Sequence, residues 1–118
     1  VTRARDEHFH VDAHIDGRTF PFLVDTDASI VAIDRDVARR IGIDPETLRY
    51  TSRIRTANGI ASAAPITIPE LSVGSITRRD VAAVVTEGDG IGTSLLGMSF
   101  LGTLRSFDFR GDRLILTD

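Results

Sequence analysis

The 118-residue sequence predicts a mostly β fold, a small closed barrel with two short helices, organised as a single domain over residues 1–118. Short apolar stretches recur at regular spacing along the chain, which is typical of small β proteins. The tight-turn dipeptides Asp16-Gly17 and Asn58-Gly59 separate some of these stretches. Only residues 35–41 and 94–104 carry apolar side chains at helical spacing.

The first strand is predicted over residues 7–16, because apolar and polar side chains alternate there. The apolar face of this strand consists of Phe9, Val11, Ala13 and Ile15. Asp16-Gly17 predicts a two-residue hairpin turn, so residues 19–24 form the returning strand. A further short strand is expected at residues 29–33.

The first helix is predicted to begin after Asp34, whose side chain can cap the free amides at the start of residues 35–41. Gly42 fits the end of this helix. A connector at residues 44–49 leads to a hairpin around Asn58-Gly59. The remaining expected elements are strands at residues 50–57, 60–68, 71–73 and 80–86, an acidic glycine-rich loop at 87–92, the second helical stretch at 94–104, and a last hairpin of residues 107–109 and 114–116.

The composition excludes several classes of function. With a formal net charge of -3, the chain lacks the broad basic surface that nucleic-acid binding requires. Without cysteine it has no thiol nucleophile and no cysteine-based zinc site. His8, His10 and His14 share one strand face, a spacing that occurs in metal sites, but a solvated face explains it more simply. We therefore expect neither a metal nor a cofactor.

The segment most informative about function is an acidic loop, Asp-Thr-Asp-Ala-Ser, at residues 25–29. A carboxylate at the end of a buried strand is costly unless it is hydrogen-bonded or used in chemistry. A calcium loop from Asp25 to Asp36 is disfavoured, because Ile30 stands where the sharp turn needs glycine. An aspartyl nucleophile of the haloacid dehalogenase type is also disfavoured, because the strand–turn–strand pattern that follows does not fit its βαβ sheet.

The same loop resembles the Asp-Thr-Gly-Ala-Ser loop of aspartic proteases. From about His10 to Leu116 the chain is similar to the bacterial retropepsin-like proteases of clan AA. The segments that carry this resemblance, in order and spacing, are Phe22–Ser29, Ala38–Ile43, Thr56–Gly59 and Leu95–Leu101. The resemblance implies a retropepsin-like closed barrel with a flap hairpin, and an aspartic endopeptidase that cleaves a peptide or protein substrate.

The resemblance also implies a role for each residue of the loop. Asp25 is the expected catalytic carboxylate, and this chemistry needs two carboxylates that share a proton and activate a water molecule. Because the chain holds one such loop, a homodimer with the dyad across its two-fold axis is expected. Thr26 is expected to bond across that axis, Ala28 to allow close packing, and Ser29 to hydrogen-bond the carboxylate.

Two further segments have expected roles. The turn at Ala57, Asn58 and Gly59 is expected to be the flap that closes over the substrate. Leu95–Gly97 is expected to thread behind the acidic loop, and Met98–Leu101 to begin the following helix.

Position 27 departs from the family pattern, because Asp27 stands in place of glycine. In a dimer this residue brings four carboxylates to one axis, where like charges repel one another. Three outcomes are open. In the first, the side chain turns into solvent or caps a backbone amide, and activity survives. In the second, repulsion weakens the dimer and lowers activity, which acid pH then favours. In the third, the chain is a catalytically silent module that binds peptides or protein partners.

The sequence begins at Val1 without a methionine, and it contains no apolar run of the roughly 18 residues that span a bilayer. Bacterial relatives often carry an N-terminal membrane segment and face the periplasm. By this resemblance we expect a periplasmic or membrane-anchored domain outside the cytoplasm, with a cytoplasmic location as the alternative. Any contact with a membrane is expected only through a segment upstream of this chain.

Overall fold

The computed structural model describes residues 9–56, 59–87 and 94–118. Its strands are β1 (His10–Ile15), β2 (Arg18–Val24), β3 (Val31–Ile33), β4 (Ser52–Thr56), β5 (Gly59–Val73), β6 (Ile76–Thr86), β7 (Ser94–Leu96), β8 (Ser106–Arg110) and β9 (Arg113–Thr117). Its helices are α1 (Arg35–Arg40), the short 3-10 helix η1 (Pro45–Thr47) and α2 (Met98–Leu101). The prediction of a mostly β fold with two short helices is therefore confirmed.

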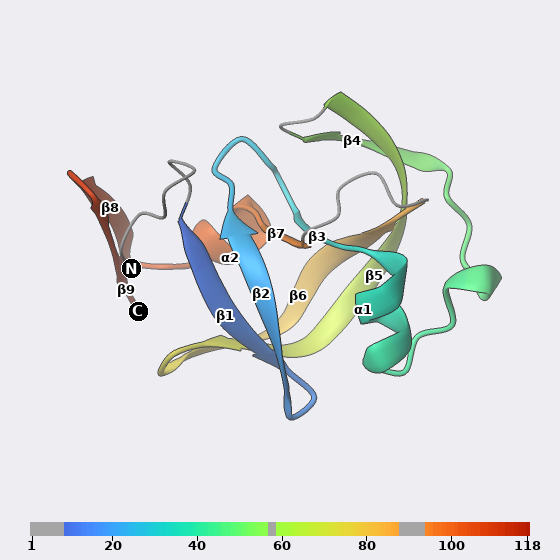
Figure 1. The fold of residues 1–118 in the computed structure, drawn as a ribbon, viewed down its shortest axis with the longest axis horizontal. Helices are drawn as coiled ribbons and strands as arrows, with labels where there is room; N and C mark the ends of the chain where they lie inside the picture. The colour runs from blue at the N-terminus through green and yellow to red at the C-terminus, as the bar shows by residue number, and fades with distance from the viewer. Residues whose placement is uncertain (1–8, 57–58, 88–93) are drawn as a thin grey trace.

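Seven strands form one sheet in the order β1-β2-β7-β3-β6-β5-β4, and β8 pairs with β9 in a separate hairpin (Figure 1). An additional pairing of β1 with β5, between residues 13–15 and 71–73, closes six of the strands into a barrel. Of the seven strands of this sheet, only β4 lies outside the closed ring, paired to the first residues of β5. The predicted closed barrel is thus confirmed, with the β4–β5 hairpin projecting from it.

Alternate side chains of the first hairpin, β1 and β2, point into the barrel and form part of its main core. Val11, Ala13 and Ile15 on β1 are buried, as are Phe20 and Phe22 on β2. The alternation read from the sequence is therefore the alternation of the buried face. Burying large apolar side chains of this kind stabilises the barrel by about 1.5–3 kcal/mol each.

Two local predictions are confirmed in detail. At the first turn, Asp16 and Gly17 have φ values of 52° and 75°, as a two-residue hairpin turn requires. Before α1, the Asp34 side chain accepts a hydrogen bond of 2.8 Å from the Val37 amide and so caps the helix. Both signals depend on neighbours within a few residues, which explains why the sequence shows them.

Several predicted boundaries are wrong. The strands expected at residues 60–68 and 71–73 are one strand, β5, and β6 begins at Ile76 instead of Asp80. The segment between the two expected strands contains Pro69, which lacks an amide donor. A strand tolerates proline where one of its edges is unpaired. Residues 64–68 and 70 of β5 pair with β6 alone among the described strands, and Pro69 itself has no partner in this register.

The apolar stretch at residues 94–104 is not one helix. Residues 94–96 form β7 and residues 98–101 form α2, with Gly97 between them as the N-cap. The parallel neighbour β2 pairs with residues 94–96, and this tertiary pairing overrides the local helical spacing. The connector at residues 44–49 also contains a helix, η1, that the sequence did not predict.

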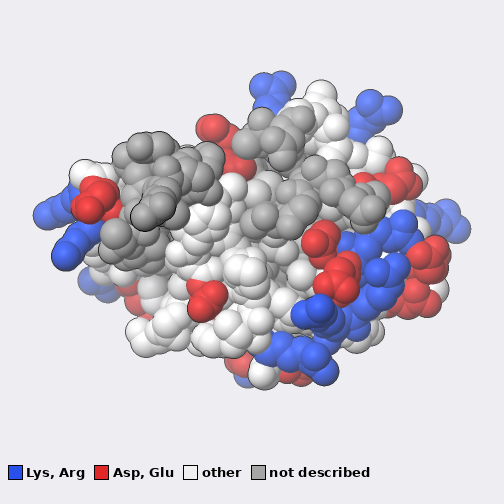
Figure 2. All heavy atoms as spheres, in the orientation of Figure 1, with Lys and Arg blue, Asp and Glu red and all other residues white. Residues whose placement is uncertain are grey.

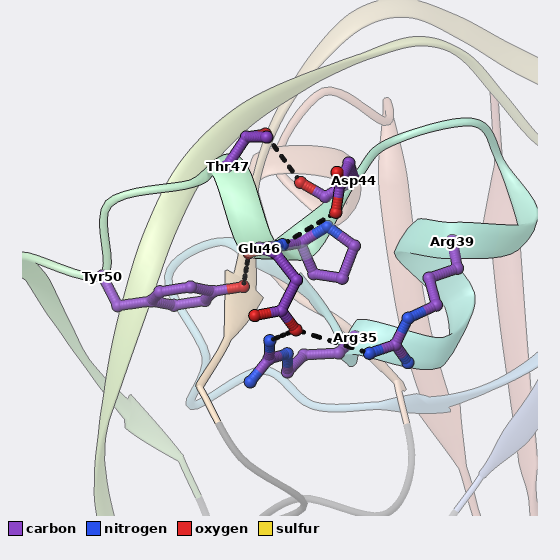
Figure 3. A network of polar contacts seen from close by, with 7 residues as sticks. Arg35, Arg39, Asp44, Glu46, Thr47 and Tyr50 are labelled. Atoms are coloured by element: carbon purple, nitrogen blue, oxygen red, sulfur yellow. Dashed lines mark hydrogen bonds and ion pairs between the residues drawn. The ribbon is translucent and has the colours of Figure 1, made fainter.

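The connection between α1 and β4 is fixed by a network of side chains (Figure 3). Glu46 forms ion pairs with Arg35 and Arg39 of α1. Asp44 caps η1 by accepting a 3.0 Å hydrogen bond from the Glu46 amide. The Tyr50 hydroxyl donates a 2.8 Å hydrogen bond to the Pro45 carbonyl, and burial raises the pKa of Tyr50 above its ordinary value of 10.0.

Charged side chains of both signs gather over α1 and the following connection, on the right of the molecule, while the centre of this face is mainly uncharged (Figure 2). Arg40 and Asp36 form one such exposed pair at 3.2 Å.

In the part of the chain that the structure describes, no helix has the length and the apolar character that crossing a membrane requires.

Candidate active site

Asp25 lies at the end of β2, where the chain leaves the barrel. It is 9% exposed, so the carboxylate is buried although it belongs to a loop. Its amide donates a 3.1 Å hydrogen bond to the Leu96 carbonyl of β7, and its carbonyl accepts one of 3.2 Å from the Ala28 amide. The backbone of Asp25 is therefore fixed both to the barrel and to its own loop.

The two carboxylate oxygens of Asp25 have different surroundings. Oδ1 accepts a 2.9 Å hydrogen bond from the Asp27 amide. Oδ2 is buried, and within residues 9–56, 59–87 and 94–118 no group hydrogen-bonds to it. A buried carboxylate oxygen without a partner is costly. The geometry thus orients the carboxylate through one oxygen and leaves the other without a hydrogen-bond partner among the described residues.

The other loop residues divide into one buried and three exposed. Ala28 is 1% exposed and packs inward, while Thr26, Asp27 and Ser29 are exposed. The described contacts of the Asp25 carboxylate include the amide of Asp27 and not the hydroxyl of Ser29, so the expected Ser29 hydrogen bond is not found there. The turn after Asp25 places the amide of Asp27, two residues later, next to the carboxylate, and this amide takes the position of hydrogen-bond donor to Oδ1.

Asp27, which stands where the loop that this sequence resembles has glycine, does not have a positive φ. Among the described residues other than glycine, only Asp16 and Asp80 have positive φ, so Asp27 lies in a region open to any residue. The hydrogen bond to Asp25 comes from the backbone amide of Asp27, so it does not depend on which side chain stands at this position. The Asp27 side chain itself is exposed. The substitution of glycine is therefore compatible with the fold of a single chain.

A segment from the C-terminal part of the chain passes behind the loop, as the sequence predicts. The strand β7 pairs in parallel with β2 and also meets β3 at Ala32 and Leu95. Just beyond it, the Met98 amide donates a 2.8 Å hydrogen bond to the Ala28 carbonyl. A Cβ placed on Gly97 would lie 2.3 Å from the Ile30 carbonyl oxygen, so only glycine permits this approach.

Sequence reasoning missed one polar residue of this region, Ser99. Its hydroxyl accepts a 2.8 Å hydrogen bond from the Val31 amide and donates one of 2.7 Å to the Ala82 carbonyl. The available signal is a hydroxyl inside the apolar run from Leu95 to Leu101. That signal says only that the side chain has a polar partner, not which one.

The expected flap corresponds to the β4–β5 hairpin. Thr56 pairs with Gly59, so the connecting residues are 57–58, one position earlier than the Asn58-Gly59 turn predicted from the sequence. Gly59 is the first paired residue of β5 and has φ 111°, a backbone conformation that favours glycine. The positive φ therefore belongs to the end of the strand. Ala57 and Asn58, the other two predicted flap residues, lie outside the described residues.

The acidic loop and the flap hairpin are joined by a small apolar cluster, separate from the main core. Its buried members are mostly small: Ala28, Ala32, Ala63, Val84 and Leu95. Leu23, Ile30 and Ile54 pack against it and are partly exposed. Apolar side chains therefore connect the acidic loop with β4 and β5.

Metal-binding residues do not converge in the described part of the chain, where no group of three or more His, Cys, Asp or Glu side chains could hold an ion. His10 and His14 lie on the exposed face of β1, and the ring nitrogen Nδ1 of His14 lies 2.9 Å from the Thr19 hydroxyl. His8 lies outside the described residues.

Comparison with known proteins agrees with this geometry. The family model of gag-polyprotein putative aspartyl proteases matches residues 11–103. The crystal structure of a retropepsin-like aspartic protease from Rickettsia conorii superposes with a TM-score of 0.83 at 36% identity, covering 98% of this chain and 94% of that one. The retroviral protease-like domain of Ddi1 from Leishmania major shares the fold, with a TM-score of 0.66 at 16% identity over 92% of this chain and 87% of that one.

Two curated bacterial proteins are also similar in sequence. One, from a Sinorhizobium species and encoded in the region 5′ of cobV, is 45% identical over 94% of this chain. The other, from Rickettsia prowazekii, is 35% identical over 98% of this chain. Both carry the description "uncharacterized protein". The chain spans about half the length of these relatives, 48% of the first and 49% of the second.

Proposed function

The chain belongs to the gag-polyprotein aspartyl protease family, and from that membership we propose that it is one half of a homodimeric aspartic endopeptidase. Asp25 and its symmetry mate form the catalytic dyad in this proposal. Peptide or protein segments are the substrates, and no metal or cofactor takes part. The retropepsin-like fold supports the general protease function.

The proposal is based on a difference in hydrogen bonding between the two carboxylate oxygens of Asp25. Oδ1 is oriented by the Asp27 amide, while Oδ2 is buried and lacks a partner among the described residues. Hydrolysis by this route needs a second carboxylate and a water molecule beside the first. The chain has one such loop, so a second chain supplies the missing groups.

In the proposed mechanism, one carboxylate of the dyad takes a proton from the water as the water attacks the peptide carbonyl. The other member of the dyad, which carries the shared proton as a carboxylic acid, donates that proton to the carbonyl oxygen. Thr26 is exposed at the loop, and we assign it to the contact across the two-fold axis. The β4–β5 hairpin covers the substrate and orders it as an added extended strand.

Replacing the proposed dyad carboxylate tests this function directly. The Asp25→Asn substitution keeps the shape and removes the acid–base group, so cleavage of casein between pH 4 and 7 should fall by at least about 100-fold. Sedimentation velocity at the assay concentration reports whether the active species is a dimer. Unchanged cleavage by the Asn variant, or full activity in a purely monomeric sample, would contradict the proposal.

Asp27 gives a second test, because its carboxylate adds charge beside the proposed axis. Removing the repulsion with Asp27→Gly should tighten the dimer by about five- to tenfold, which corresponds to about 1 kcal/mol. Peptidase activity should rise in parallel at limiting protein concentration. Equal dimerisation and equal activity of the two forms would place the Asp27 side chain away from the axis. Peptide binding without cleavage by either form would favour the catalytically silent module.

A further inference from the structure

The hydroxyl of Ser99 joins two strands directly behind the acidic loop. It accepts the 2.8 Å hydrogen bond of the Val31 amide at the start of β3, and it donates the 2.7 Å hydrogen bond to the Ala82 carbonyl of β6. The two strands pair in parallel at this end, with Val31 opposite Ala83. Ser99 thus bridges β3 and β6 at the place where the ladder between them begins.

This bridge needs a side chain that is donor and acceptor at once. A hydroxyl offers one donor and two acceptor lone pairs, so a single oxygen serves both the amide and the carbonyl. Alanine at this position would leave the Val31 amide and the Ala82 carbonyl without this partner. Val31 is buried, so an unpaired amide there is costly, whereas the Ala82 carbonyl lies at an exposed position.

The bridge is mechanically connected to the acidic loop. The Met98 amide holds the Ala28 carbonyl at 2.8 Å, and Gly97 lies tightly against the Ile30 carbonyl. With the Ser99 contact to Val31, three consecutive residues therefore hold the segment 28–31. The start of the loop is fixed separately, by the Asp25 amide on the Leu96 carbonyl.

We propose that Ser99 is a positioning residue for the Asp25 carboxylate, acting through residues 28–31 and the Asp27 amide. The inference rests on the proposed peptidase function for its kinetic consequence, and on the hydrogen bonds alone for its structural one. Losing the hydroxyl frees the far end of the loop. The Asp27 amide then loses its alignment with Oδ1 of Asp25, although neither residue has changed.

The α2 region offers a matched control. The Thr103 hydroxyl also serves two partners: it donates a 2.6 Å hydrogen bond to the Phe100 carbonyl and accepts one of 3.0 Å from Nε of Arg78. It lies on the C-terminal side of α2, and none of its hydrogen bonds reaches the loop. Ser99→Ala and Thr103→Ala therefore each remove a bridging hydroxyl, but only the first removes a contact with the loop.

The experiment compares Ser99→Ala, Ser99→Thr and Thr103→Ala by the amide NMR signal of Asp27, which reports the Asp25 carboxylate. We expect Ser99→Ala to displace this signal and to speed hydrogen exchange at Asp27 and Val31. Ser99→Thr keeps a hydroxyl, so its Asp27 amide signal and its hydrogen exchange should resemble those of the wild type. Thr103→Ala should change neither the signal nor the exchange. If Ser99→Ala does not fold, Ser99→Cys, with its weak donor and acceptor, should give an intermediate displacement.

Casein cleavage provides the kinetic readout. We expect kcat to fall by about 10- to 100-fold in Ser99→Ala, with KM within about twofold, because positioning rather than binding is lost. An unchanged Asp27 amide in a folded Ser99→Ala or Ser99→Cys variant would overturn the inference, as would an equal displacement in Thr103→Ala. If wild-type protein cleaves nothing, the proposed function fails, and the amide measurement still decides the role of Ser99.

Discussion

The acidic loop after β2 and the connection between α1 and β4 are both irregular segments, but they are held in different ways. The loop is held mainly through backbone groups: the amides of Asp25 and Met98 donate to carbonyls of the opposite segment. The connection is held by partly or largely exposed side chains, above all Glu46 with two arginines. The difference indicates that a buried carboxylate needs fixed backbone, whereas a surface connection tolerates adjustable contacts.

Substitutions in the two regions should therefore change the free energy of unfolding by different amounts. A group placed against backbone cannot move aside, so a wrong atom there shifts the whole segment. Exposed ion pairs contribute about 0–1 kcal/mol, because water and salt screen them. Substitutions behind the loop should therefore cost far more than substitutions in the network of Figure 3.

Gly97→Ala should have the largest effect. The added Cβ would meet the Ile30 carbonyl oxygen at 2.3 Å and the Ala28 carbonyl oxygen at 2.8 Å, both backbone atoms. Displacing the loop should lower the free energy of unfolding by about 3 kcal/mol or more, which chemical denaturation measures.

Gly42→Ala is the matched control for that substitution. Gly42 has φ 91°, but a Cβ there would meet nothing within 4 Å. Only backbone strain is added, at a cost of about 1–2 kcal/mol. Equal losses for the two variants would show that the contact behind the loop is not tighter than a surface turn.

Tyr50→Phe should have an intermediate effect. It removes the 2.8 Å hydrogen bond to the Pro45 carbonyl, which contributes about 1 kcal/mol near neutral pH. The residue is also the only tyrosine in a chain without cysteine. The absorbance of tyrosinate near 295 nm therefore reports this one hydroxyl.

The pH dependence of stability follows from the raised pKa of Tyr50, which burial causes. The folded chain holds the phenolic proton more tightly than the unfolded chain. This contribution is fully present below pH 10.0, the ordinary pKa, and is lost as pH rises through the raised value. Urea denaturation at pH 8 and pH 11 should show this loss in the wild type and a smaller one in Tyr50→Phe. Identical losses in both proteins would contradict the assignment.

Glu46→Gln should have the smallest effect. Its carboxylate is largely exposed and pairs with Arg35 and with Arg39, the latter at 3.8 Å. We expect a loss of no more than about 1 kcal/mol, which 1 M NaCl abolishes. Glu70→Gln, which removes an exposed pair with Arg79 at 3.5 Å, is the control for a pair outside the network. A larger, salt-independent loss in Glu46→Gln would show that the network is as rigid as the acidic loop.

The features that the sequence predicts correctly depend on near neighbours. The Asp16-Gly17 turn, the Asp34 cap and the alternation along β1 each involve residues only a few positions apart. The resemblance adds the retropepsin-like fold, because the loop and the segment from Leu95 to Gly97 occur together. These signals suffice for the closed barrel and for the position of the acidic loop within it.

The features that the sequence does not predict depend on distant partners. Whether residues 94–96 form a strand or a helix is decided by β2, which lies some seventy positions earlier. Gly59 is paired in β5 and not part of the turn predicted at Asn58-Gly59, because pairing between β4 and β5 sets the register. Ser99 is missed for the same reason, since its two partners belong to β3 and β6.

The separation between Val31 and Ser99 is 68 residues, and it governs when the acidic loop can form during synthesis. The residues that hold the back of the loop, Leu96 to Ser99, are synthesised about seventy positions after Asp25. Contacts between distant segments form slowly, because long loops must close first. A growing chain can thus complete the first hairpin and α1 while the back of its acidic loop is still open, so the candidate active site forms after both of these elements.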